Sequence, residues 1–98
     1  MTQEQIIFLR SYDFLRIGQA ISHQNWTSAG MCVQKLQKQA MNLELKDFER
    51  LFGNLKLAVA HREKKTALDI LAQITARRVA ALNRLGNEQK SAEEKQIQ

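Results

Sequence analysis

Residues 31–43 read MCVQKLQKQAMNL and belong to the most regular stretch of the chain. Apolar residues recur here at intervals of three and four, which places them along one side of an α-helix. Polar residues, mainly glutamine and lysine, fall on the other sides. The pattern predicts an amphipathic helix over about residues 27–42. Its apolar stripe is Trp26, Ala29, Val33, Leu36, Ala40 and Leu43.

Three further segments carry the same kind of helical pattern, over about residues 2–22, 46–61 and 64–85. Proline is absent from the whole chain, which favours helix throughout because proline breaks helix interiors. The main apolar stripes of these segments are Ile7, Phe14, Ile17 and Ile21; Phe48, Leu51, Phe52, Leu55 and Val59; and Ala67, Leu68, Leu71, Ile74, Ala81, Leu82 and Leu85.

Several polar residues and a glycine mark where these helices begin and end. Thr2 and Gln5 have the spacing of a capping box at the start of the first helix. Asn42 suits the left-handed position that follows a helix end. Gly86 and Asn87 predict the end of the last helix.

Four amphipathic helices with short connections predict an all-α, antiparallel, up-down-up-down four-helix bundle over residues 1–86. An array of two helical hairpins is the alternative architecture. Residues 87–98 read NEQKSAEEKQIQ and lack an apolar stripe. We therefore expect a flexible, polar C-terminal tail over residues 87–98.

The composition is that of a single small domain: 98 residues, of which 44% are hydrophobic and 26% charged. No apolar run is long enough to cross a membrane, and the polar, acidic N-terminus is unlike a signal peptide. The single cysteine, Cys32, has no partner for an internal disulfide. We therefore expect a cytoplasmic protein without contact to a membrane.

The chain carries no recognisable pattern of a catalytic or metal site. His23 and His61 fall at predicted helix boundaries, without a Cys, Asp or Glu partner at ligand spacing. Glu44, Asp47 and Glu49 fit a simpler role, as negative charge at the start of a helix. No glycine-rich phosphate loop is present. We expect no enzymatic activity, no cofactor and no metal.

The net charge of +5 is compatible with an acidic partner, and equally with a basic surface that serves only solubility. Nucleic-acid-binding proteins usually concentrate basic residues on one face, whereas here they are spread over several predicted helices. The aromatic residues fall mostly on apolar stripes, where they serve the core and not base stacking. A protein partner is therefore favoured, and a nucleic-acid-associated protein or other basic helical adaptor is the alternative.

From Ile21 onward the chain resembles a histidine phosphotransfer (HPt) domain. Asn25 and Trp26 match a D/N-W pair of that family, and VQKLQKQAMNLE at residues 33–44 follows the frame of its motif A-H-x-L-K-G-x-A-x-x-L-G. The resemblance covers about residues 5–85 and implies a four-helix bundle. The positions that fit the motif are Leu36, Ala40, Asn42 and Leu43.

The departures from the motif fall on its functional positions. Gln34 stands where the family has the phosphate-accepting histidine, Gln37 replaces a lysine, and Lys38 and Glu44 replace glycines. A neutral imidazole nitrogen can attack an aspartyl phosphate. The nitrogen lone pair of a glutamine amide is delocalised into its carbonyl, so Gln34 cannot perform this step. The resemblance implies a pseudo-phosphotransfer domain without catalytic activity.

Members of the HPt family dock the receiver domains of two-component signalling around this helix. The resemblance therefore implies a receiver domain as partner, docked on Gln34, Lys35, Gln37, Lys38 and Met41. Two alternatives stay open: that these five residues form a solvated helix face, and that His23 or His61 carries phosphate instead. The oligomeric state also stays open, since three apolar residues fall off the main stripes and would be covered in a dimer: Ile6, Leu9 and Ile70.

Overall fold

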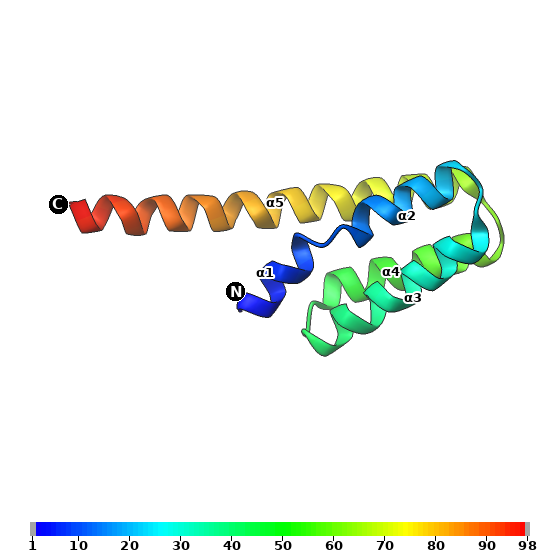
Figure 1. The fold of residues 1–98 in the computed structure, drawn as a ribbon, viewed down its shortest axis with the longest axis horizontal. Coiled ribbons are helices and arrows are strands. Elements are labelled where there is room, and N and C mark those ends of the chain that lie inside the picture. The colour runs from blue at the N-terminus through cyan, green and yellow to red at the C-terminus, as the bar shows by residue number, and fades with distance from the viewer. Residues whose placement is uncertain (1, 98) are drawn as a thin grey trace.

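The computed structural model describes the backbone of residues 2–97 and the side chains of residues 2–85. In this part of the chain all regular structure is α-helical. Four long helices run alternately in opposite directions (Figure 1), and each packs on its sequence neighbour, with the last closing on the first long one. The predicted all-α four-helix bundle is confirmed. The helices are α1 (Gln3–Leu9), α2 (Asp13–Ser22), α3 (Trp26–Asn42), α4 (Lys46–Ala60) and α5 (Lys64–Ile97).

The first predicted helix, over residues 2–22, is in fact two helices. Helix α1 ends at Leu9 and α2 begins at Asp13. The predicted capping box is present at the start of α1: the Thr2 hydroxyl accepts from the Gln5 backbone N–H, and the Gln5 side chain accepts from the Thr2 backbone N–H. The Gln5 amide also donates to the Leu43 carbonyl over 2.8 Å, which fastens α1 to the turn after α3.

Arg78 of α5 holds the break between α1 and α2. Its Nε donates to the carbonyl of Leu9, one of the acceptors that the end of a helix leaves without an intrahelical partner. The same guanidinium lies over the Phe14 ring, 5.1 Å from the ring centroid. On the other side of the break, the Ser11 hydroxyl accepts from the Asp13 backbone N–H. One arginine thus fixes both helix ends to α5.

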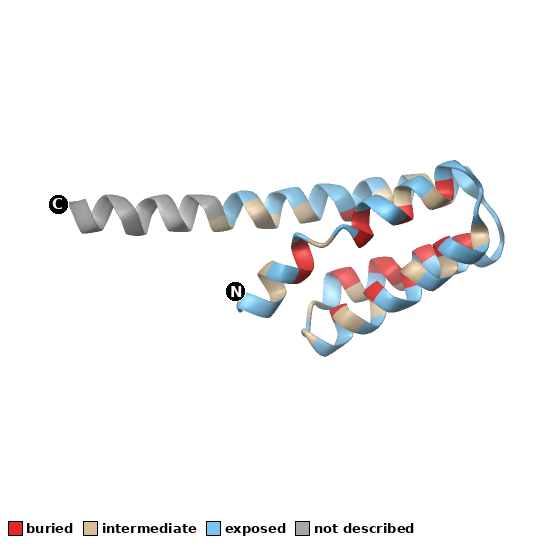
Figure 2. Cartoon of the chain, viewed as in Figure 1, coloured by how far each residue is buried: buried red, intermediate tan, exposed pale blue. Residues whose placement is uncertain are grey.

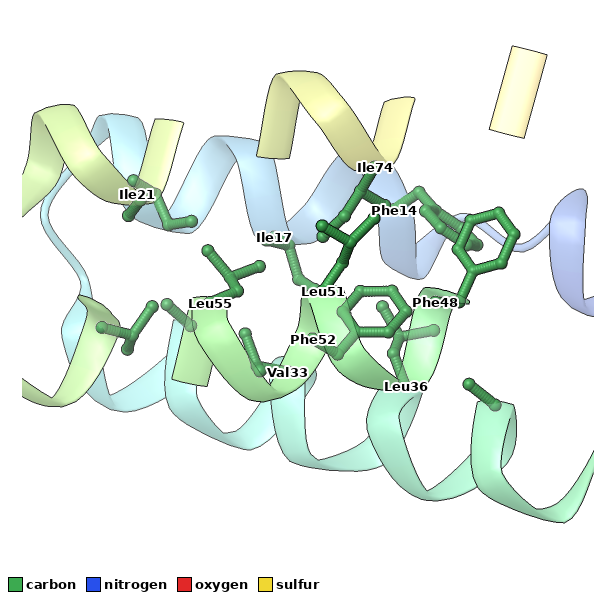
Figure 3. Close-up of a cluster of buried hydrophobic side chains, with 14 of the residues drawn as sticks. Phe14, Ile17, Ile21, Val33, Leu36, Phe48, Leu51, Phe52, Leu55 and Ile74 are labelled. Carbon is green, nitrogen blue, oxygen red and sulfur yellow. The ribbon is translucent and has the colours of Figure 1, made fainter. Parts of the chain in front are cut away.

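All four phenylalanines of the chain gather in one cluster inside the bundle: Phe8, Phe14, Phe48 and Phe52. Their ring centroids lie 5.3 to 6.5 Å apart, mostly edge to face, the arrangement that aromatic quadrupoles favour. Three of them appear in Figure 3, which also shows the aliphatic side chains of the neighbouring helices pointing into the same space.

The predicted apolar stripes supply most of the rest of the core, and the buried residues lie on the sides of the helices that face one another (Figure 2). Ile7 is the exception among the stripe residues: it is 63% exposed, so its assignment to the first stripe was wrong. Leu9, which falls off the predicted stripes, is fully buried, because the break turns α1 back against the bundle. Ile70 is partly buried against the core. The aliphatic core residues of the long helices are Ile17, Ile21, Ala29, Val33, Leu36, Ala40, Leu51, Leu55, Ala58, Val59, Ala67 and Ile74.

The three turns between the long helices share one geometry. Each contains a non-glycine residue with positive φ: Gln24 at 57°, Glu44 at 58° and Arg62 at 55°. In each turn, the backbone N–H of the residue with positive φ donates to the carbonyl three positions earlier. The N–H of the residue that follows it donates to the carbonyl five positions before itself, and the two bonds together resemble the Schellman motif. The five-position bonds run from Asn25 to Ala20, from Leu45 to Ala40 and from Glu63 to Ala58.

Two predicted helix ends differ from those in the structure. Asn42 is the last residue of α3, and Glu44 takes the left-handed position that the sequence assigns to Asn42. Helix α5 continues to Ile97, past the stop predicted at Gly86 and Asn87. The side chains of residues 86–98 lie outside the described part of the chain, so the flexible tail over residues 87–98 stays a prediction.

We expect Gln24→Gly to raise the free energy of unfolding by about 1 kcal/mol, because glycine removes the steric cost of the left-handed conformation. Urea denaturation followed by far-ultraviolet circular dichroism measures this. The matched control is Gln19→Gly on the exposed side of α2, where the same change should lower stability by about 1 kcal/mol. Equal destabilisation by both changes would contradict the turn geometry at Gln24.

Candidate docking surface

Helix α3 is held in the bundle by one fully buried side. Its start is capped by Asn25, whose side-chain oxygen accepts from the Ser28 backbone N–H over 3.3 Å. Because a helix repeats every 3.6 residues, the residues opposite the buried stripe must face solvent. The buried stripe of α3 consists of Ala29, Val33, Leu36 and Ala40, each 0% exposed.

Three of the five predicted docking residues lie together on the solvent side of α3. Gln34, Lys38 and Met41 are all exposed, and on an ideal helix their side chains lie within about 60° of one another. Met31, which the sequence analysis did not assign, is on the same side and is 71% exposed. Met31 precedes Gln34 by three residues, and this spacing places both on the same side of a helix, so the sequence could have predicted Met31 as part of the surface. We call Met31, Gln34, Lys38 and Met41 the outer α3 face.

The other two predicted docking residues turn toward neighbouring helices. The Lys35 Nζ lies 3.0 Å from the Asp13 carboxylate of α2. Gln37 is partly buried against α4, where its Nε2 would lie 3.3 Å from a Cβ added at Gly53. Four of the five predicted residues are therefore exposed, and Gln37 is partly buried; of the exposed four, Lys35 also forms an ion pair with α2.

The buried carboxylate of Asp13 accounts for the position of the Lys35 ammonium group, although the Lys35 side chain is itself 58% exposed. Asp13 is only 7% exposed. Besides Lys35, its carboxylate accepts from the Ser11 hydroxyl over 3.3 Å and lies 3.6 Å from the Arg16 guanidinium. A buried charge is tolerated when it is paired and hydrogen-bonded. Lys35 is thus a link between α2 and α3, and removing it would leave Asp13 with less compensation.

Cys32 lies on α3 beside this ion pair and is partly buried. Burial raises the pKa of its thiol above the ordinary value, and the negative charge of Asp13 raises it further, against the smaller opposing effects of Lys35 and Arg16. A thiol with a raised pKa is mostly protonated at neutral pH and is a poor nucleophile. Cys32 is therefore suited to packing and not to catalysis.

A hollow lies between α3 and α4 next to the outer α3 face. Its apolar lining includes Trp26, Met31 and Val59, and two cations, Lys56 and Arg62, stand beside them. Gln34 also lines it. The sequence analysis missed Lys56 and Arg62, because only the packing of α4 against α3 brings them to this surface.

His23 and His61 are exposed cap residues at the ends of α2 and α4. Within the described side chains, no group of three or more His, Cys, Asp and Glu residues could hold a metal ion. In the same part of the chain, no helix has both the length and the apolar character needed to cross a membrane.

Comparisons of the chain with models of protein families, with curated proteins and with solved structures found no match. The HPt resemblance therefore depends on residues 25–44 and on the bundle architecture alone. Because unrelated proteins share four-helix bundles, the fold by itself does not assign the activity.

We expect Cys32 to react slowly with a disulfide reagent in the folded protein at mildly alkaline pH, and faster in Asp13→Asn. Removing the negative charge of Asp13 lowers the pKa of the thiol, which increases the thiolate fraction at a given pH. Absorbance of the released thiolate measures the rate. In denaturant the two chains should react equally, and equal rates in the folded proteins would contradict an effect of Asp13.

Proposed function

We propose that this chain is a non-catalytic protein-binding module that docks a partner through the outer α3 face and carries no phosphate. The observation that supports this most is the pair of exposed methionines on either side of an exposed lysine: Met31 is 71% exposed and Met41 is 53% exposed, with Lys38 between them. The partner we propose is a receiver domain of two-component signalling, the class that the HPt resemblance implies.

Methionine side chains suit a docking surface because they are flexible and polarisable, and can adapt to the shape of a partner. Two large apolar residues on the exposed side of one helix provide apolar surface that a partner can cover. Within the described side chains, Lys38 pairs with no carboxylate, whereas Lys35 and Arg77 do. Lys38 therefore remains available to meet an acidic group on a partner.

The side chain at position 34 supports the proposed absence of phosphate transfer. Gln34 is exposed at the site where the motif has its histidine, so a docked receiver would reach it. Its amide nitrogen is not a nucleophile, because its lone pair is delocalised into the carbonyl. The proposed module therefore recognises a receiver without accepting its phosphoryl group.

We expect the protein to retain no acid-labile phosphate after incubation with acetyl phosphate or with a radiolabelled, phosphorylated receiver domain. The informative comparison is Gln34→His, which restores an imidazole at the exposed position and should acquire label from a receiver that docks in this frame. Label on the unaltered chain, at His23 or His61, would contradict the proposal.

Lys38→Glu should weaken the binding of a receiver domain by about tenfold or more, because it sets a carboxylate against an acidic partner. Calorimetric titration against a panel of receiver domains measures this. The matched control is Arg84→Glu on the exposed side of α5, which changes the net charge equally and should leave the affinity within about twofold.

Equal losses from Lys38→Glu and Arg84→Glu would show that bulk charge drives binding, and not the outer α3 face. Titration with DNA and RNA at two salt concentrations tests the alternative class. Binding to nucleic acid that falls steeply with salt, together with no binding to any receiver, would replace the proposed function by a nucleic-acid-associated role.

A further inference from the structure

We propose that the hollow between α3 and α4 binds an apolar side chain flanked by carboxylates, so that the docked element of the partner is an acidic, amphipathic helical segment. This inference rests on the proposed function, because it names the chemistry of the partner at the edge of the outer α3 face. We call the site the Trp26 hollow and define it by Trp26, Gly30, Met31, Val59, Lys56 and Arg62.

Small residues keep the floor of the Trp26 hollow open. Gly30 has no side chain, and a Cβ added there would only just touch the Val59 side chain, at 3.9 Å. Trp26 forms one wall; it is partly exposed and packs against the core on its other side. Met31 is exposed and adaptable. The hollow thus offers an apolar floor to a side chain entering from solvent.

The charges beside the Trp26 hollow are all of one sign. Lys56 and Arg62 are exposed, and neither forms an ion pair with a carboxylate of the described side chains. No acidic residue lines the hollow. Arg62 projects from a turn whose backbone bonds its own N–H to the Val59 carbonyl, which fixes the base of its side chain. Two uncompensated cations next to an apolar floor complement a partner that carries both carboxylates and an apolar anchor.

The Trp26 hollow is continuous with the outer α3 face, and this favours a helical segment over a small anion as its ligand. Met31 and Gln34 line the hollow and also belong to that face, so a bound segment can continue along α3 toward Lys38. An amphipathic helix presents apolar anchors at intervals of three and four residues, which would place successive anchors on the hollow and on the methionines. A free phosphate or a single carboxylate would use only the cations.

The only tryptophan of the chain, Trp26, reports directly on the hollow. The probe is a synthetic helical peptide without tryptophan, with leucines at every third and fourth position and glutamates between them. We expect a saturable shift of Trp26 emission to shorter wavelength as the probe is added to the full chain. A second peptide, with lysines in place of the glutamates, should produce no shift.

The double variant Lys56→Glu/Arg62→Glu should lose affinity for the glutamate peptide by about tenfold or more, and should gain binding to the lysine peptide. The matched control is Lys64→Glu/Lys65→Glu at the start of α5, which makes the same charge change with exposed residues near the same turn but outside the hollow. It should bind the glutamate peptide within about twofold of the unaltered chain. Thermal unfolding checks that both variants fold.

The outcomes separate this inference from the proposed function. One outcome would reject the Trp26 hollow as a binding site and keep the outer α3 face as the docking surface. In that outcome Lys38→Glu weakens receiver binding, the receiver does not shift Trp26 emission, and Lys56→Glu/Arg62→Glu binds the receiver as well as the unaltered chain does. Binding of the glutamate peptide without any receiver binding would keep the hollow and exclude receivers as partners. Any of three results would overturn the inference: equal loss of affinity in both double variants, equal binding of both peptides, or a shift of Trp26 emission with free phosphate but not with the glutamate peptide.

Discussion

Edge-to-face contacts among the rings of Phe8, Phe14, Phe48 and Phe52 join parts of the chain that the turns do not join. The rings come from α1, α2 and α4, and α2 and α4 stand diagonally in the ring of long helices. Each such aromatic pair contributes about 0.5–1.5 kcal/mol beyond the area that it buries. Phe8 reaches the cluster from a separate helix: the chain bends between α1 and α2 (Figure 1), and Arg78 binds the Leu9 carbonyl at the end of α1.

Ion pairs within the bundle engage some of the basic residues, and those of the candidate docking surface have no carboxylate partner among the described side chains. Lys35 and Arg16 lie beside the buried Asp13, Arg77 pairs with Asp47 across α4 and α5, and Arg78 is committed to α1 and α2. Lys38, Lys56 and Arg62 pair with no carboxylate in the described part of the chain and lie along α3 and α4. These three cations lie near the exposed Met31 and Met41, whereas other basic residues without an ion pair in the described side chains, such as Arg50 and Lys64, lie outside this surface.

The three turns define where the helices that form this surface begin and end. A non-glycine residue in the left-handed conformation costs about 1–2 kcal/mol, so each turn persists only because the helices that it joins are packed. The hydrogen bonds of the Schellman motif fix where each helix ends. The turn at Arg62 therefore sets the position of one cation of the Trp26 hollow, and the turn at Gln24 sets the start of the helix that carries Trp26.

The sequence by itself determined the number, order and buried sides of the long helices, because the spacing of apolar residues is a local property of the chain. It also placed Gln34, Lys38 and Met41 on the solvent side of α3. Only the tertiary structure decided that residues 10–12 interrupt a continuous helical pattern, that Lys35 belongs to Asp13, and that Lys56 and Arg62 stand beside Trp26. Each of these depends on contacts between residues far apart in the sequence, and local periodicity contains no record of such contacts.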